Sequence, residues 1–105
     1  MGDKRLSYPI HSTDTDEKTS LSYPSLYHVV LLNDDYTTME FVQKVIEKVF
    51  HKTAQEAMQI MLEVHRTGKG VAGTYTRDIA RTKAERVMHL AFRENFPLKC
   101  IVERV

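Results

Sequence analysis

The sequence predicts an α/β fold, a two-layer sandwich in which a three-stranded antiparallel sheet packs against three helices in the order β-α-α-β-α-β. Two observations lead to this prediction. Three short runs are rich in apolar and β-branched residues, as strands are. The segments between them carry apolar residues at helical spacing, and each begins with a threonine suited to capping. Because the apolar face of a small sheet needs cover, the helices are expected to form the second layer.

The first strand is expected at residues 27–32, an apolar and β-branched run that ends at a polar turn, 33–35. Thr37 and Glu40 match a capping box, in which the Thr oxygen accepts from the helix backbone and the Glu side chain reaches back. This box predicts the start of a helix. Its core-facing residues follow i, i+3, i+4, i+7 spacing and are Val42, Val45, Ile46, Val49 and Phe50.

A second capping box, Thr53 with Glu56, predicts the next helix, which Gly68 is expected to end. The apolar side of this helix is expected to carry Ala57, Met58, Met61, Leu62 and Val64, with His65 beside them. A short glycine-rich strand is then expected at 70–75.

Thr76 can cap a third helix, which Asn95 and Pro97 are expected to end. The residues at core spacing in this helix are Ala80, Ala84, Val87, Met88 and Ala91. Residues 98–105 read as the final strand.

The chain of 105 residues is long enough for one domain. Residues 1–26 hold eight Ser and Thr, two of the three prolines and charges of both signs, without helical or strand periodicity. Such a segment buries too little apolar surface to offset the entropy of ordering it. We therefore expect a flexible N-terminal extension at 1–26 and a folded domain at 27–105.

Composition argues against several classes of function. With 15 basic and 14 acidic side chains, the net charge of +1 gives no general attraction to nucleic acid or to a membrane surface. No apolar run approaches the ~20 residues of a membrane span, and the start has no hydrophobic stretch typical of a secretory signal. A single cysteine excludes an internal disulfide and fits a reducing compartment. A cytoplasmic protein without a cofactor is therefore expected.

Three other features have simple structural explanations. Gly68-x-Gly70-x-x-Gly73 matches a dinucleotide-binding string, but it leaves a helix and enters a strand, so these glycines are expected to end the helix and bend the strand. Cys100 lies in the middle of a strand with nothing to lower its thiol pKa, which favours a small buried hydrophobe over a nucleophile. The histidines show no pair at i, i+4, so a metal site is not expected; they are His11, His28, His51, His65 and His89.

The most distinctive polar cluster is the turn at 33–35 together with His65. The simplest explanation of the turn is an Asx-type turn with solvated acids. Against this, Met61, Val64 and His65 lie at i, i+3, i+4, so a polar histidine borders an apolar stripe. If this helix faces the turn, hydrogen-bond acceptors converge beside an apolar hollow, which suits a ligand with an ammonium group next to a hydrophobic side chain. A carboxylate–histidine set can also perform acid–base chemistry, but here neither a nucleophile nor a metal accompanies it.

Longer motifs identify a family. The chain carries NDDYTTMEFV at 33–42, MLEVH at 61–65 and TK at 82–83, and in this order and spacing it closely resembles the ClpS family from about residue 27 to residue 105. The resemblance implies an adaptor and not an enzyme. ClpS proteins capture proteins that begin with Phe, Tyr, Trp or Leu and hand them to the ClpA-type AAA+ unfoldase of the Clp protease. A monomer with this partner and no cofactor is thus expected.

The resemblance also implies roles for individual residues. Asn33, Asp34 and His65 would hold the α-amino group of the substrate, and Asp35 would complete the acidic turn. The side-chain pocket would be lined by Leu31, Thr37, Met39, Val42, Met61, Val64 and Leu98, with Met39 as a gatekeeper that excludes β-branched first residues. Asp78 and Lys83 on the third helix would dock the unfoldase, and the N-terminal extension would take part in delivery.

Two positions depart from the family pattern. Thr38 stands where the family usually has proline, in what is expected to be the first helical turn, and this is expected to loosen the pocket rim slightly. Asp78 stands where glutamate is typical, which keeps the charge but shortens its reach.

Two other functions are compatible with the residues. A docking module of the same fold could bind protein helices, with the acidic turn purely structural, and would be indifferent to acetylation of a peptide's N-terminus. A small hydrolase using Asp34 and His65 would show turnover, and the missing nucleophile argues against it.

Overall fold

The computed structural model describes residues 23–105, in which three strands and three helices alternate as β-α-α-β-α-β. The elements are β1 (Leu26–Leu32), α1 (Met39–Phe50), α2 (Ala54–Thr67), β2 (Lys69–Thr76), α3 (Arg77–Arg93) and β3 (Lys99–Arg104). The first strand thus begins at Leu26, one residue before the expected start of the domain. Most of the extension predicted at 1–26 lies outside the described residues, so its flexibility stays a prediction.

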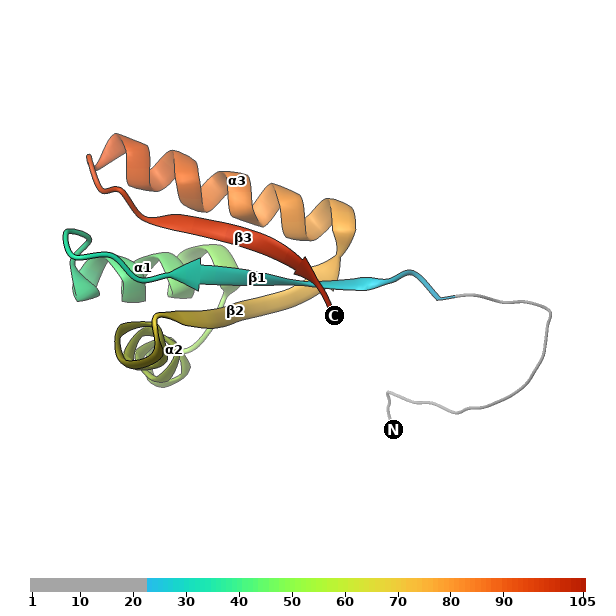
Figure 1. Ribbon diagram of the computed structural model, residues 1–105, viewed down its shortest axis with the longest axis horizontal. Coiled ribbons are helices and arrows are strands. Elements are labelled where there is room, and N and C mark those ends of the chain that lie inside the picture. Colours follow the sequence, from blue (N-terminus) through green and yellow to red (C-terminus); the bar gives the residue numbers. More distant parts are fainter. Residues whose placement is uncertain (1–22) are drawn as a thin grey trace.

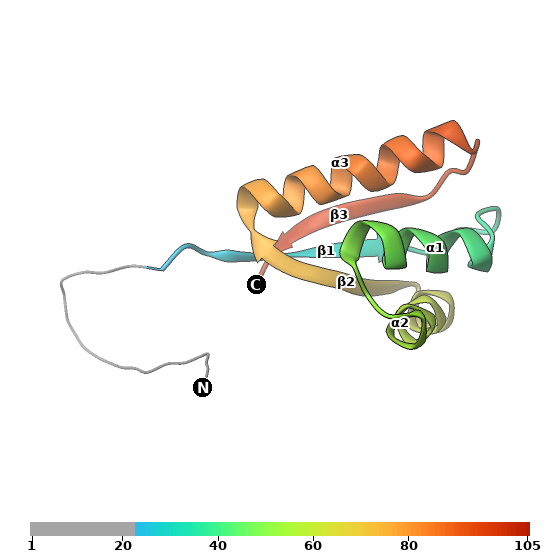
Figure 2. The ribbon, with the colours of Figure 1, turned by 180° about the vertical axis from the view of Figure 1, so that it is seen from behind.

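The sheet has the strand order β2-β1-β3, and both pairs are antiparallel, which confirms the predicted sheet. Tyr27 pairs with Tyr75 on one side and with Arg104 on the other. The register with β2 shifts by one residue between Val29 and Val30, opposite Ala72, so the glycine-rich strand carries a bulge. Seen from the front and from behind, α1 lies over one face of the sheet, α3 runs along β3, and α2 lies beside β2 (Figures 1 and 2).

The core lies between the sheet and the helices. Its residues from β1 are Val29 and Leu31, and all five residues predicted for α1 are buried. In α2 and α3 the buried residues are Ala57, Met61, Val64, Ala80, Ala84, Val87 and Ala91. Met58 and Met88 were expected in the core but are 47% and 41% exposed. Each follows a buried residue directly, and one step along a helix turns a side chain about 100° away from that residue's face.

The helix ends confirm one capping box and correct the other. The Thr53 hydroxyl accepts from the backbone N–H of Glu56 at 3.1 Å, and the Glu56 carboxylate accepts from that of Thr53 at 3.0 Å. The prediction of a capping box at Thr37 is wrong, because the N-cap of α1 is Thr38. The Thr38 hydroxyl accepts a hydrogen bond from the backbone N–H of Phe41 at 3.1 Å. Thr38 is therefore a cap and not part of the first helical turn. Thr76 is the N-cap of α3, but its side chain makes no capping bond.

The glycines and the cysteine behave as the sequence predicts. Gly68 ends α2 with φ = 96°, a conformation that favours glycine, and the chain then enters β2. A Cβ on Gly70 would lie 2.9 Å from Cγ2 of Val64, so this glycine allows α2 to pack closely on the strand. Half-buried Cys100 places its thiol 3.4 Å from the carbonyl oxygen of Ala84, and burial raises its pKa to about 11. The thiol is therefore protonated at neutral pH and serves as a packing group.

Candidate functional site

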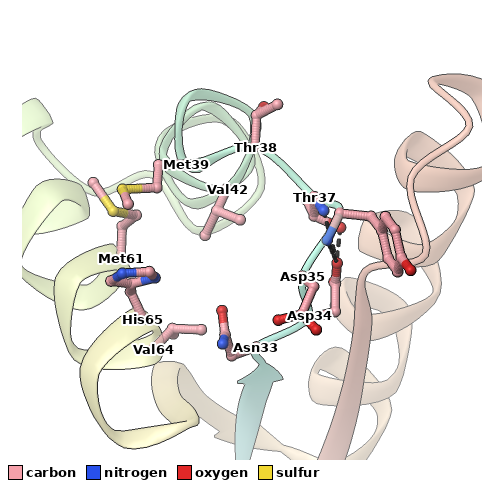
Figure 3. A pocket seen from close by; sticks show the side chains of 11 residues that line it. Asn33, Asp34, Asp35, Thr37, Thr38, Met39, Val42, Met61, Val64 and His65 are labelled. Atoms are coloured by element: carbon pink, nitrogen blue, oxygen red, sulfur yellow. Dashed lines mark hydrogen bonds between the residues drawn. The ribbon is translucent and has the colours of Figure 1, made fainter.

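A cavity of about 390 Å³ opens where β1 ends, between the turn that follows it and the helices α1 and α2 (Figure 3). This volume lies within the ~300–1,000 Å³ typical of small-ligand pockets. The residues that line it are Asn33, Asp34, Asp35, Tyr36, Thr37, Thr38, Met39, Val42, Met61, Val64 and His65. The acidic turn and His65, which are distant in the sequence, therefore meet at one site.

Backbone contacts bring these segments together. The N–H of Asn33 donates to the carbonyl of Gly68 at 2.9 Å, and the N–H of Gly68 donates to the carbonyl of Val64 at 3.0 Å. The first bond ties the end of β1 to the end of α2, and His65 lies in the last turn of that helix. The position of His65 beside Asn33 thus follows from how the strand and the helix end.

Asp34 organises the turn. Its Oδ1 atom accepts from the backbone N–H of Tyr36 at 2.8 Å and of Thr37 at 2.7 Å, and its Oδ2 atom accepts from the Thr37 hydroxyl at 2.7 Å. Burial opposes ionisation, but the hydrogen bonds from Thr37 and Tyr36 outweigh it and lower the pKa of Asp34 below its ordinary value. The predicted Asx-type turn is therefore present, and it occupies three acceptor positions of this carboxylate.

Asn33, Asp35 and His65 are exposed polar side chains on the rim of the pocket. Within residues 23–105, none of the three side chains makes a hydrogen bond or an ion pair. Figure 3 shows Asn33 projecting from the end of β1, with His65 on one side of it and Asp35 on the other. A carboxylate, an amide oxygen and an imidazole nitrogen can each accept a hydrogen bond. The rim thus offers acceptors to a bound cation.

The opposite part of the pocket is apolar. Val42, Met61 and Val64 are 7%, 8% and 2% exposed and form its deeper surface, whereas Met39, at the start of α1, is 45% exposed. All four come from the two helices (Figure 3). An apolar group can therefore be buried against α1 and α2 while a cation meets the rim.

The sequence-based list of pocket residues differs from the observed lining at four positions. Leu31 and Leu98, 0% and 2% exposed, belong to the core and do not line the cavity. Leu98 instead borders a separate hollow near Phe92 and Phe96. Tyr36 and Thr38 do line the cavity; neither is among the residues assigned to the pocket, although Thr38 was expected to affect its rim. Their place inside the motif at 33–42 is the signal that could have identified them.

The two residues expected to dock an unfoldase lie elsewhere. Asp78 and Lys83 line a different cavity, beside α3 and the end of α1, together with Lys48, His51 and Arg86. The Lys83 ammonium donates to the carbonyl of Val49 at 2.7 Å and lies 5.5 Å from the centre of the Tyr75 ring. Lys83 therefore supports the C-terminal end of α1.

The described residues contain neither a cluster suited to a metal ion nor a helix suited to a membrane. Between residues 23 and 105, His, Cys, Asp and Glu side chains form no group of three or more that could hold a metal ion. In the same part of the chain, no helix is both long and apolar enough to cross a membrane.

Comparison with known proteins shows the family to which the chain is similar. Residues 22–101 match the family model described as ATP-dependent Clp protease adaptor protein ClpS. The ATP-dependent Clp protease adapter protein ClpS of Acetivibrio thermocellus is 56% identical over 80 residues, which cover 76% of this chain and 81% of the relative. The protein of the same name from Neisseria meningitidis is 52% identical over 99 residues, or 90% of this chain and 96% of the relative.

A solved structure resembles the fold. It is Agrobacterium tumefaciens ClpS2 bound to L-phenylalaninamide, which has a TM-score of 0.77 and 41% sequence identity and covers 79% of this chain and 100% of its own. Three-dimensional similarity, the family model and close relatives therefore agree, and the chain belongs to the ClpS family of ATP-dependent Clp protease adaptor proteins.

Proposed function

We propose that this protein binds proteins bearing Phe, Tyr, Trp or Leu at the N-terminus, through the free α-amino group and the first side chain, and delivers them to a ClpA-type AAA+ unfoldase for degradation by the Clp protease. The observation that carries the proposal is one cavity that combines an acceptor-rich rim with an apolar inner surface. The protein would act in the cytoplasm as a monomer, without catalytic activity of its own.

The rim provides for the amine. An α-amino group has an ordinary pKa of ~7.7–8.0 and is mostly cationic at neutral pH. Enclosing it costs free energy unless acceptors replace its water, and Asn33, Asp35 and His65 have acceptors with no other partner among the described residues. Asp34 directs its hydrogen bonds into the turn, so we assign direct contact with the ammonium to Asp35 and mainly a positioning role to Asp34. This reverses the emphasis that the resemblance alone suggests for the two aspartates.

The inner surface provides for the first side chain. Burying a large aromatic or leucine side chain contributes about 1.5–3 kcal/mol, and Val42, Met61 and Val64 offer an apolar surface for it. The ligand of the related Agrobacterium tumefaciens protein, L-phenylalaninamide, contains a free α-amine and a phenyl side chain and little else. A ligand of that size and chemistry supports a pocket in which the rim binds the amine and the inner surface binds the side chain. Met39 at the mouth would crowd a branch at Cβ and so exclude Ile and Val.

Delivery would use a second surface. The cavity containing Asp78 and Lys83 is formed by α3 and the end of α1, away from the peptide pocket, so one protein could hold a substrate and an unfoldase together. The family's description as an adaptor for the Clp protease supports this assignment. The extension at 1–26 would contribute to delivery and not to capture.

The contacts in the pocket favour binding over hydrolysis. Its two threonine hydroxyls are engaged, since Thr37 donates to Asp34 and Thr38 caps α1. The hydrogen bonds that lower the pKa of Asp34 also make it a poor general base. Cys100 lies outside the pocket lining and carries a raised pKa.

One titration tests the proposal. Peptides that differ in the first residue alone, each with a free or an acetylated N-terminus, are titrated into the protein by isothermal calorimetry. Peptides beginning with Phe or Leu should bind, and acetylation should cost at least about 2 kcal/mol because the rim acceptors that the bound peptide covers then lack a partner. Equal affinity for the free and acetylated forms would favour the docking-module alternative, and hydrolysis of any peptide would favour the enzyme.

A further inference from the structure

The pocket contains an oxidisable group at its mouth. Two methionines line the cavity, and Met39 is 45% exposed whereas Met61 is 8% exposed. Both thioethers lie on the helical side of the pocket, where the apolar part of a substrate would be bound (Figure 3). We propose that Met39 is a site of reversible oxidation and that its sulfoxide form weakens the binding of an apolar first residue. The proposal rests on the proposed function of this pocket.

The oxidant would be a peroxide. A lone pair of the Met39 sulfur attacks one oxygen of hydrogen peroxide, the O–O bond breaks as the S–O bond forms, and the departing hydroxide takes up the remaining proton to leave water. Sulfur loses two electrons and the peroxide gains them. The reaction requires contact with solvent, which Met39 has and Met61 largely lacks.

Oxidation would change the chemistry of the pocket mouth. A thioether is apolar and polarizable, whereas a sulfoxide has an oxygen that holds water tightly. Val42, Met61 and Val64 have no side-chain donor for that oxygen, and the polar rim residues Asn33 and His65 would be engaged by the substrate amine under the proposed function. A substrate that covers the mouth would remove the water without replacing its hydrogen bonds, so affinity should fall roughly tenfold or more.

The chain contains its own controls. Met58 on α2 and Met88 on α3 are 47% and 41% exposed, close to the value for Met39, and neither lines this cavity. Peroxide should therefore reach all three, but only the sulfoxide at Met39 should affect the affinity for a peptide.

The experiment measures oxidation and binding on the same sample. The full-length chain is treated with graded hydrogen peroxide, and the oxidised fraction at each methionine is measured by peptide mass spectrometry. Affinity for a fluorescent peptide with a free N-terminal Phe is followed by anisotropy. Affinity should fall with the sulfoxide fraction at Met39, and methionine sulfoxide reductases of both stereospecificities should restore it. Bound peptide should slow oxidation of Met39 and leave that of Met58 and Met88 unchanged.

Variants make the test specific. A Met58→Leu, Met88→Leu double variant should keep the full sensitivity to peroxide. Met39→Leu should show the same affinity before and after treatment, whatever its starting affinity. The inference is overturned if affinity survives complete oxidation of Met39, or if Met39→Leu remains sensitive. If the untreated protein does not bind the free-amine peptide, the proposed function is wrong, and this inference fails with it.

Discussion

The backbone N–H of Asn33 donates to the carbonyl of Gly68 at 2.9 Å, which joins the end of the central strand to the end of α2. Gly68 adopts φ = 96°, so the chain can leave the helix there and pair at once with β1 as β2. The contact places the last turn of α2, with His65, beside the polar turn that starts at Asn33. The acceptor-rich rim of the pocket is thus a consequence of where two elements end.

The two aspartates of the turn are expected to respond differently to substitution. Asp34→Ala removes three hydrogen bonds within the turn and should lower the free energy of unfolding by about 1–3 kcal/mol. Asp35→Ala removes none within the described residues and should change it by less than about 0.5 kcal/mol. Both should weaken binding of a Phe peptide, Asp35→Ala by roughly tenfold or more through loss of the ammonium partner. Chemical denaturation and calorimetry measure the two effects, and unchanged peptide affinity in Asp35→Ala would contradict its assigned contact.

Acid should weaken the turn. Since hydrogen bonding lowers the pKa of Asp34 in the folded protein, its ionised form stabilises the fold fully above the unfolded value of ~3.9, and this contribution is lost as pH falls through the lower, folded value. Thr37→Val removes the hydroxyl donor and should raise the pKa of Asp34. The stability difference between wild type and variant should therefore shrink as pH falls from ~6 to ~3. The pKa of Glu56, which the capping box with Thr53 also lowers, should stay unchanged in the variant and serves as an internal control in an NMR titration.

Met39 is expected to set the shape of side chain that the pocket accepts. Met39→Ala should allow peptides beginning with Ile or Val to bind while Phe and Leu peptides still do, because the alanine leaves room for a branch at Cβ. Met88→Ala is the matched control, since Met88 is 41% exposed but lies outside the cavity. Calorimetry with the four peptides decides the matter. Unchanged discrimination against Ile in Met39→Ala would show that another residue excludes it.

Lys83 is expected to have a structural and a docking role that must be separated. Lys83→Met loses the bond to Val49 and the contact with Tyr75, and should lower the free energy of unfolding by about 1–2 kcal/mol. Asp78→Asn alters an exposed charge and should change it by at most about 0.5 kcal/mol. Both variants should keep peptide affinity but slow degradation of a Phe-bearing substrate by a ClpA-type unfoldase with its protease, assayed well below the melting temperature. A normal rate of degradation with Asp78→Asn would show that the Asp78 carboxylate is not needed for docking.

The N-terminal extension is expected to act in delivery alone. Deletion of residues 1–22 leaves every described element in place, so melting temperature and peptide affinity should be nearly unaltered. Degradation of the model substrate should fall in the same assay. Weaker peptide binding by the truncated chain would mean instead that the extension contributes to the pocket.

The sequence by itself determined the element order, the second capping box, the helix stop at Gly68 and the residues of α1 that face the core, because each depends on neighbours within one or two turns of chain. The family motifs likewise identified the turn and His65 as one site. Tertiary structure decided what depended on distant contacts. Local pattern could not tell that Met58 and Met88 face solvent. The family resemblance placed Leu31 and Leu98 in the pocket, whereas both lie in the core and do not line the cavity. Local pattern also could not choose between Thr37 and Thr38 as the cap. That choice follows from Asp34, whose carboxylate accepts a hydrogen bond from the Thr37 hydroxyl in the turn after the strand. Thr38 is then the residue that caps the helix. Asp35 keeps a carboxylate without a partner among the described residues.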